Sequence, residues 1–194
     1  MEMKTLIDLY ETCRTYRRFR QEPLSREFLT ALVDTARKRS NGRNKQPWHY
    51  YIVASRENVA ALQPLVNWAA ALPKEIGTPK PGEQPVAFIV MARENEDPAF
   101  NLTDAGIAFD TIALLAISQG VGTALLGAVN RKEIQKCLAI PEDQEVIFAI
   151  GLGYPAHKST IVPLQDKART DYYVDADRDY YVPKKALEDV MQYR

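Results

Sequence analysis

The feature that most constrains this fold is an almost wholly apolar segment at residues 104–119, which has the length and composition of a helix. A helix that is apolar on all sides must be surrounded by protein or by lipid. The longest apolar stretch, residues 105–117, is broken by Asp110 and Thr111 and falls short of the roughly 20 residues that cross a bilayer. We therefore expect this helix to be enclosed by protein.

The rest of the chain alternates helices with short apolar strands. Expected helices cover residues 5–12, 25–39, 55–72 with an interruption at Pro64, 130–138 and 184–193, and expected strands cover residues 49–54, 86–91, 122–129 and 145–151. Ser25 and Asn130 are the expected N-caps. A chain of 194 residues can bury well over half of its unfolded surface in one domain. The pattern predicts a single α+β domain over residues 1–194, with a central mixed sheet of four or five strands flanked by helices.

Two segments lack this pattern. Residues 73–85 form a loop rich in proline and glycine, and they are the best candidate for a mobile cover. Residues 157–182 are polar and rich in tyrosine, and they are too numerous for an ordinary connection. We expect residues 157–194 to be an extended C-terminal segment that wraps along a surface, with a partner subunit as a candidate.

Composition excludes several classes of function. Lysine plus arginine and aspartate plus glutamate number 25 each, so no net field favours nucleic acid or an anionic membrane, and the expected partner is a small molecule. Cys13 and Cys137 lack the spacing of a zinc site and are expected to be small buried residues without a disulfide. His49 and His157 are too few for a metal centre or a Ser-His-Asp triad, and are expected to be structural or exposed. With no signal-peptide core at the start, we expect a cytoplasmic protein.

Two short motifs carry the chemistry. Residues 14–19, Arg-Thr-Tyr-Arg-Arg-Phe, place three guanidinium groups and a hydroxyl close together, and residues 41–48, Asn-Gly-Arg-Asn-Lys-Gln-Pro-Trp, hold amides and a glycine before an aromatic segment. Guanidinium groups bind phosphate with two-point geometry, so the motifs predict a phosphorylated, flat cofactor. A formal GxGxxA at residues 151–156 is a strand-end turn rather than a dinucleotide site, because no helical pattern follows it.

These motifs resemble those of the FMN-dependent nitroreductases. The first fits that family's basic-Ser/Thr-x-Arg/Lys-x-Phe/Tyr pattern, and residues 40–48 fit its second pattern, which ends in Asn-x-Gln-Pro-Trp. The likeness continues through residues 65–72, 120–127, 151–155 and 182–189, and so spans nearly the whole chain. The chain departs from the family at Cys13, where many relatives have arginine, and at Thr15 and Asn41, where many have serine. The set of residues that bind the phosphate is therefore expected to be displaced by one position in the sequence.

The resemblance implies a set of FMN-binding residues. Arg14 and Thr15 would bind the phosphate, Arg17 would face the N1 and O2 edge of the pyrimidine ring, and a backbone N–H near Leu126 would lie beside flavin N5. Residues of the second motif would reach FMN from the other subunit, and lysines near the C-terminus would complete the phosphate site. The full implied set is Arg14, Thr15, Arg17, Ser40, Asn41, Gly42, Asn44, Asn67, Leu125, Leu126, Gly127, Lys184 and Lys185. Arg18 is expected to have no role in binding FMN.

The same resemblance implies a nitroreductase-like homodimer with FMN at the subunit interface and residues 104–119 in the dimer core. Hydride would pass from NADH or NADPH through flavin N5 to a nitroaromatic, a quinone or a similar small acceptor in two half-reactions. Neither a catalytic side chain nor a metal is required by this scheme. Two alternatives remain open: another flavoenzyme on this scaffold, dehalogenase-like or dehydrogenating, and a non-catalytic module that binds flavin or lacks it. The segments at residues 73–85 and 157–182 would distinguish the enzymes.

Overall fold

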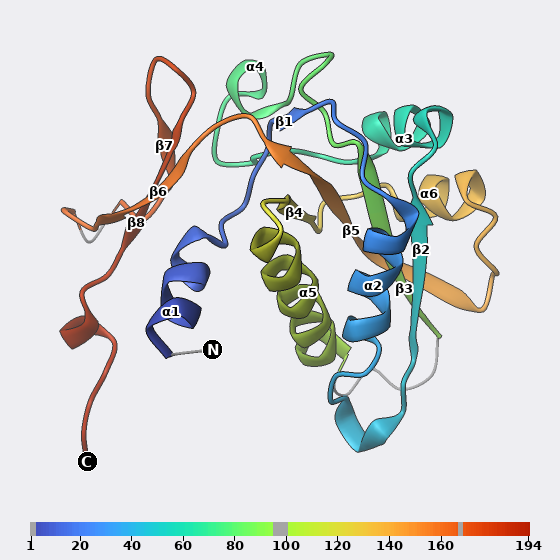
Figure 1. Ribbon diagram of the computed structural model, residues 1–194, viewed down its shortest axis with the longest axis horizontal. Helices are drawn as coiled ribbons and strands as arrows, with labels where there is room; N and C mark the ends of the chain where they lie inside the picture. Colours follow the sequence, from blue (N-terminus) through green and yellow to red (C-terminus); the bar gives the residue numbers. More distant parts are fainter. Residues whose placement is uncertain (1–2, 95–100, 167–168) are drawn as a thin grey trace.

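The structure is a computed structural model that describes residues 3–94, 101–166 and 169–194. Its helices are α1 Met3–Thr12, α2 Arg26–Ala36, α3 Arg56–Leu62, α4 Lys74–Gly77, α5 Asn101–Ser118 and α6 Arg131–Cys137, with 3-10 turns η1 Gly42–Asn44, η2 Gln63–Leu65 and η3 Leu187–Asp189. Its strands are β1 Phe19–Arg20, β2 Trp48–Val53, β3 Ala87–Glu94, β4 Gly122–Leu126, β5 Gln144–Pro155, β6 Ser159–Pro163, β7 Tyr173–Val174 and β8 Tyr180–Lys184. Figure 1 shows this arrangement.

The larger sheet is organised around β5, its longest strand. The strand order is β1-β5-β3-β2, and β4 also pairs with β5. These ladders are all antiparallel, while a parallel bridge joins Thr15 to Thr123 of β4. The expected α+β class and central sheet are thus confirmed. The bridge also attaches the first motif directly to the strand that follows α5.

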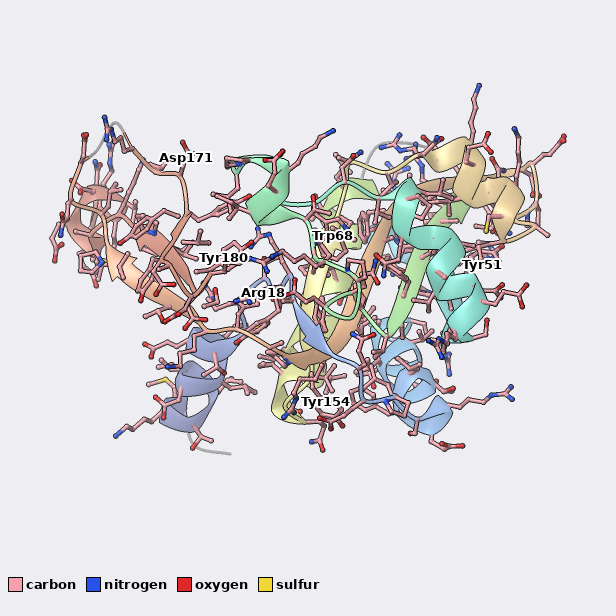
Figure 2. The ribbon with its side chains drawn as sticks, turned by 90° about the horizontal axis from the view of Figure 1, so that it is seen from above. Arg18, Tyr51, Trp68, Tyr154, Asp171 and Tyr180 are labelled. Carbon is pink, nitrogen blue, oxygen red and sulfur yellow. The ribbon has the colours of Figure 1, made fainter. Side chains whose placement is uncertain are left out.

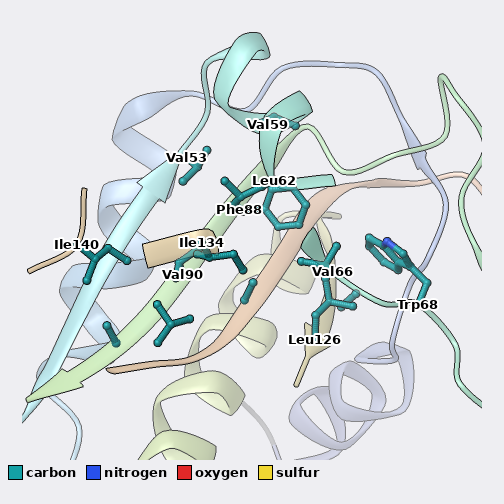
Figure 3. Close-up of a cluster of buried hydrophobic side chains, with 14 of the residues drawn as sticks. Val53, Val59, Leu62, Val66, Trp68, Phe88, Val90, Leu126, Ile134 and Ile140 are labelled. Atoms are coloured by element: carbon teal, nitrogen blue, oxygen red, sulfur yellow. The ribbon is translucent and has the colours of Figure 1, made fainter. Parts of the chain in front are cut away.

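Helices cover both faces of this sheet, as the continuous apolar run of β3 requires. Alternate side chains of β3 point to opposite sides, so Phe88 packs with α3 and α6 in one core, while Ile89 packs with α2 and α5 in the other. Figure 3 shows the first core. Ile112 of α5 is fully buried in the second core, and α2 and α5 lie together in front of the sheet in Figure 1.

The expected helix starts are confirmed by their caps. Ser25 Oγ accepts a hydrogen bond from the N–H of Phe28 at 3.1 Å, at the start of α2. Asn130 Oδ1 accepts from the N–H of Glu133 at 3.4 Å, at the start of α6. These bonds satisfy amide groups that the first helical turn leaves unpaired.

The C-terminal region differs from the expectation. Residues 157–182 do not merely wrap a surface, because they contribute to a second sheet in which β8 pairs in parallel with β6 and antiparallel with β7. The expected helix at residues 184–193 is wrong: Tyr180–Lys184 is a strand, and only the short η3 follows. Pairing with Ser159–Pro163 overrides the local helical pattern. This second sheet stands at one side of the molecule, beside α1 (Figure 1).

The structure corrects two further expectations and adds detail to a third. The helix does not resume through residues 68–72; instead Val66 bridges Val129 of the segment after β4, and residues 70–72 form a turn. The loop at residues 73–85 contains α4 and is anchored by Glu83, whose carbonyl accepts from the N–H of Phe19 at 2.8 Å and whose carboxylate accepts from Arg178 at 3.0 Å. Cys137 is exposed rather than buried.

Candidate functional site

A cavity of about 220 Å³ lies where the N-terminal motif, α5 and the second sheet meet. Its wall contains Arg14, Thr15, Arg17 and Lys184, four of the residues predicted to bind FMN. Cys13, Asp110, Thr123 and Tyr172 are among the other lining residues. The fold therefore brings residues from the two ends of the chain to one site.

The backbone of the first motif is held by β4. Thr15 bridges Thr123, and the N–H of Tyr16 donates to the Thr123 carbonyl at 2.9 Å. Tyr16 is buried, so the residues on either side of it, Thr15 and Arg17, are left to line the cavity. Lys184 ends β8 and joins them from the second sheet.

The charge of the cavity favours an anion. Arg14, Arg17 and Lys184 contribute three cations against the single carboxylate of Asp110. Arg14 is partly engaged by the end of α1 and by the preceding residue, because Nε donates to the Cys13 carbonyl at 2.8 Å and Nη2 donates to the Tyr10 carbonyl of α1 at 3.2 Å. These bonds place the guanidinium at the C-terminal end of α1.

Arg17 has contacts on both its side chain and its backbone. Its guanidinium carbon lies 4.5 Å from the ring centroid of Tyr172 and 4.8 Å from that of Tyr180. Its backbone N–H donates to His157 Nε2 at 2.9 Å. His157 is buried, which confirms the expectation of a structural histidine there, while His49 pairs with Glu94 at the surface.

Arg18 does not line this cavity, but it has a structural role. Its Nη2 donates to the carbonyls of Asp177 and Arg178, at 3.1 and 2.9 Å, and Nη1 lies 3.9 Å from Glu83. Figure 2 shows Arg18 beside Tyr180, where the second sheet joins the body of the molecule. Arg18 therefore ties the β7–β8 turn to the loop that holds Glu83.

The second motif lies at the start of α5, away from the cavity. The N–H of Gly42 donates to both carboxylate oxygens of Asp104, at 3.1 and 3.0 Å, in the first turn of α5, whereas the cavity takes Asp110 and Ala113 from further along that helix. Asn41 Oδ1 is buried and has no hydrogen-bond partner among the described residues. Within one chain, the predicted ligands Ser40, Asn41, Gly42 and Asn44 are thus not brought to the cavity.

The backbone of this second motif is strained. Arg43, Asn44 and Gln46 all have φ near +50°, a region that side chains other than glycine rarely adopt. Such strain of about 1–3 kcal/mol per residue persists only where the surroundings impose it, and it is frequent at ligand sites. The buried carboxylate of Asp104 is one such constraint, because it fixes Gly42 at the start of the turn.

The remaining predicted residues lie beside β4 or outside the cavity. Leu126 is buried at the end of β4, Leu125 is 40% exposed, and Gly127 follows them. Asn67 Nδ2 donates to the Ala128 carbonyl at 3.2 Å, and Asn67 lines a separate cavity of about 890 Å³ under the loop at residues 73–85. Lys185 is exposed and does not line the smaller cavity.

FMN fits the chemistry of the smaller cavity but exceeds its size. Guanidinium, ammonium and hydroxyl donors suit a phosphate monoester. A volume of about 220 Å³ is below the about 300–1,000 Å³ that is typical of small-molecule sites. The cavity of a single chain is therefore smaller than a typical cofactor site. Across the described ranges, no group of three metal-ligating side chains occurs, and no helix is long and apolar enough to cross a membrane.

Three cavity or support residues were missed by sequence reasoning. Tyr172 and Asp110 line the cavity, and Asp104 holds Gly42. The tyrosine-rich composition of residues 157–182 is the sequence signal that could have indicated Tyr172. Asp104 and Asp110 had no local signal beyond being carboxylates before and within an apolar run.

Comparison with known proteins identifies the family. The model of the Nitroreductase family matches residues 11–154. A protein of Archaeoglobus fulgidus, provisionally named NADH dehydrogenase/NAD(P)H nitroreductase, is 24% identical over 180 residues, covering 87% of this chain and 96% of its own. The iodotyrosine deiodinase of Thermotoga neapolitana is 22% identical over 171 residues, covering 79% and 90%.

Solved structures agree at the level of the fold. The FMN and NADPH-dependent nitroreductase NfnB from Sphigopyxis sp. strain HMH superposes with a TM-score of 0.69 at 14% identity, covering 97% of this chain and 98% of its own. The α+β architecture built around β5 is therefore the nitroreductase fold. The family model covers well over half of the sequence, and the chain belongs to the Nitroreductase family.

Proposed function

We propose that this protein is an FMN-dependent NAD(P)H oxidoreductase of the nitroreductase type. The observation that carries the proposal is the cavity in which Arg14, Thr15, Arg17 and Lys184 converge. These residues come from distant parts of the sequence and coincide with the positions at which the family motif predicts ligands. Relatives whose names contain NAD(P)H nitroreductase, or FMN and NADPH dependence, support the choice of cofactor and electron donor.

The residues of the cavity would each bind a different part of the cofactor. Arg14, Thr15 and Lys184 would hold the phosphate, where cationic and hydroxyl donors give charge-assisted hydrogen bonds. Arg17 would place a fixed positive charge at the pyrimidine edge, which stabilises negative charge that develops on reduction. The chemistry that FMN supplies when bound is the transfer of hydride from NADH or NADPH to a small acceptor. A side chain acting as acid or base is not needed.

The proposed enzyme is a homodimer. Leu102 of α5 is 79% exposed, and Gly106 and Asp110 of the same helix are also exposed in a single chain. Leu187, Val190 and Met191 near the C-terminus are exposed as well. A partner that covers α5 would bury this surface, and its second motif would supply Asn41 and Gly42 to the FMN site. Residues 157–194 would then reach the partner through their last residues.

Purification and anaerobic titration test this proposal. We expect a yellow protein that releases FMN on denaturation and that bleaches when NADH or NADPH is added without oxygen. Flavin that neither nucleotide reduces would overturn the oxidoreductase assignment, and a colourless protein that does not bind added FMN would overturn the cofactor. The matched spectrum of free FMN with the same nucleotide provides the control for direct reduction.

A screen of acceptors distinguishes the enzyme classes on this scaffold. The relationship to an iodotyrosine deiodinase is the specific reason to include halogenated phenols beside nitroaromatics and quinones. We expect nitroaromatics and quinones to reoxidise the reduced protein in both the NADH and the NADPH series. Release of halide in place of this reoxidation would assign the protein to the dehalogenating class.

A further inference from the structure

We propose that His157, Tyr172 and Tyr180 are positioning residues that hold Arg17 in the orientation required at the FMN site. This inference rests on the proposed function and assigns these residues a role beyond it. The three side chains surround one arginine from its backbone and from its guanidinium. All three belong to the C-terminal part of the chain, so they connect the second sheet to the first motif.

The guanidinium is held by two aromatic rings. Its central carbon lies 4.5 Å from the Tyr172 centroid and 4.8 Å from the Tyr180 centroid, both within the about 6 Å range of cation–π attraction. The two rings are themselves 5.9 Å apart and inclined by 41°, so they form two walls rather than one plane. An arginine that contacts both walls loses much of its rotational freedom before a ligand arrives, which lowers the entropic cost of binding.

The backbone of Arg17 is held by His157. Nδ1 of this histidine lies 2.8 Å from the Lys158 carbonyl, which can only accept, so Nδ1 carries the proton. Nε2 is then free to accept the N–H of Arg17 at 2.9 Å. The same Lys158 carbonyl accepts the N–H of Tyr180 at 2.9 Å. One carbonyl therefore sets both the tautomer of His157 and the position of Tyr180 relative to Arg17.

The rings pack against one another in a continuous row of tilted pairs, which restrains this arrangement. The His157 ring lies between Tyr16 and Tyr180, with centroid distances of 5.4 and 4.8 Å. Tyr180 is 2% exposed and His157 is 9% exposed. Tyr172 is the more accessible member, and its hydroxyl accepts a weak hydrogen bond from the N–H of Ala71 at 3.4 Å. Tyr172 also lines the cavity itself, so it can be altered with less risk to the core.

Substitution of Tyr172 provides the test, with FMN dissociation constants and flavin midpoint potentials as readouts. Tyr172→Leu removes the ring and keeps apolar bulk, and we expect a roughly three- to tenfold weaker FMN affinity and a lower potential. Tyr172→Phe retains the ring and should restore both values. Tyr173→Leu is the matched control, because the neighbouring Tyr173 is 51% exposed and stacks on Tyr181 instead of Arg17.

A double-mutant cycle shows whether Tyr172 acts through Arg17. In the Arg17→Ala background, Tyr172→Leu should have no further effect on affinity or potential, since the residue that it positions is gone. Additive effects in the cycle, or equal losses in Tyr172→Leu and Tyr173→Leu, would overturn the positioning role while leaving FMN binding by the wild type intact. A wild-type protein that does not bind FMN would instead overturn the proposed function and this inference with it.

His157 is tested with a second pair of variants. His157→Gln retains an acceptor for the N–H of Arg17, whereas His157→Leu removes it. We expect His157→Gln to retain more of the FMN affinity and of the midpoint potential than His157→Leu, with folding monitored by circular dichroism. Identical potentials in wild type and in folded His157→Leu would overturn the role of this histidine.

Discussion

At the scale of single residues, Arg17 is the cation that we assign to the redox-active ring. A hydrogen bond to a charged group contributes about 1.5–3 kcal/mol, so Arg17→Ala should weaken FMN binding roughly 10- to 100-fold. The midpoint potential of the bound flavin should also fall, because a fixed cation stabilises the reduced anion. Fluorescence titration and potentiometry with reference dyes measure these effects.

The control for Arg17→Ala is Arg20→Ala. Arg20 belongs to the same arginine-rich region, but its side chain is 56% exposed and it pairs with Glu22 at 3.2 Å. We expect neither affinity nor potential to change in this variant. If Arg17→Ala behaved in the same way, Arg17 would not face the pyrimidine edge.

At this scale, sequence reasoning succeeded for side chains that belong to a recognisable binding motif. It failed for side chains whose contacts lie far away in the sequence. Arg14, Thr15, Arg17 and Lys184 were predicted and do line one cavity. The role of Arg18 was missed, because Asp177 and Arg178 lie about 160 residues away in sequence. A local pattern cannot indicate such a contact.

At the scale of elements, the predictions held where the local pattern and the packing agree. The helix at residues 104–119 and the capped starts of α2 and α6 follow from apolar content and capping residues, and the structure confirms these elements, although only one face of α5 is buried within a single chain. The expected C-terminal helix failed because the pairing of Tyr180–Lys184 with Ser159–Pro163 is non-local. Helix propensity is a weak preference that tertiary pairing overrides.

The junction between β5 and β6 should make stability depend on pH through His157. The pKa of His157 is lowered from 6.5 to about 4: burial is the largest cause, Arg18 and Arg17 also lower it, and the hydrogen bond to the Lys158 carbonyl and the charge of Asp179 partly oppose this shift. Between these two values the unfolded chain binds more protons than the folded chain, so the free energy of unfolding rises with pH. The contribution of neutral His157 to the free energy of unfolding is fully present above about pH 6.5. It declines by on the order of 3 kcal/mol as the pH falls toward 4.

Urea denaturation across this pH window measures the effect. His157→Gln has no imidazole to titrate, so its stability should change less with pH than that of the wild type. His49→Gln is the matched control, because His49 is 37% exposed and pairs with Glu94 at the surface. The same pH dependence in wild type and His157→Gln would show that other groups are responsible.

At the scale of the whole molecule, the two halves of the predicted site lie at different positions along α5. Arg14 and Lys184 line the cavity, while Gly42 is held by Asp104 in the first turn of that helix. Sequence motifs identified both halves, but no sequence pattern states whether they meet within a chain or between chains. A homodimer packed across α5 would resolve this separation, because each chain would complete the other's site.

Gly106 gives this dimer a direct test. A Cβ added there meets no atom of the described residues within 4 Å, so Gly106→Leu should leave the single chain folded, and replacing a helical glycine should stabilise it by about 0.5–1 kcal/mol. A partner helix packed against α5 would instead clash with the new side chain. We expect sedimentation to give about twice the chain mass of 21.9 kDa for the wild type and a large monomer fraction for Gly106→Leu. Lys132→Leu on exposed α6 should remain dimeric, and a fully dimeric Gly106→Leu would place the interface elsewhere.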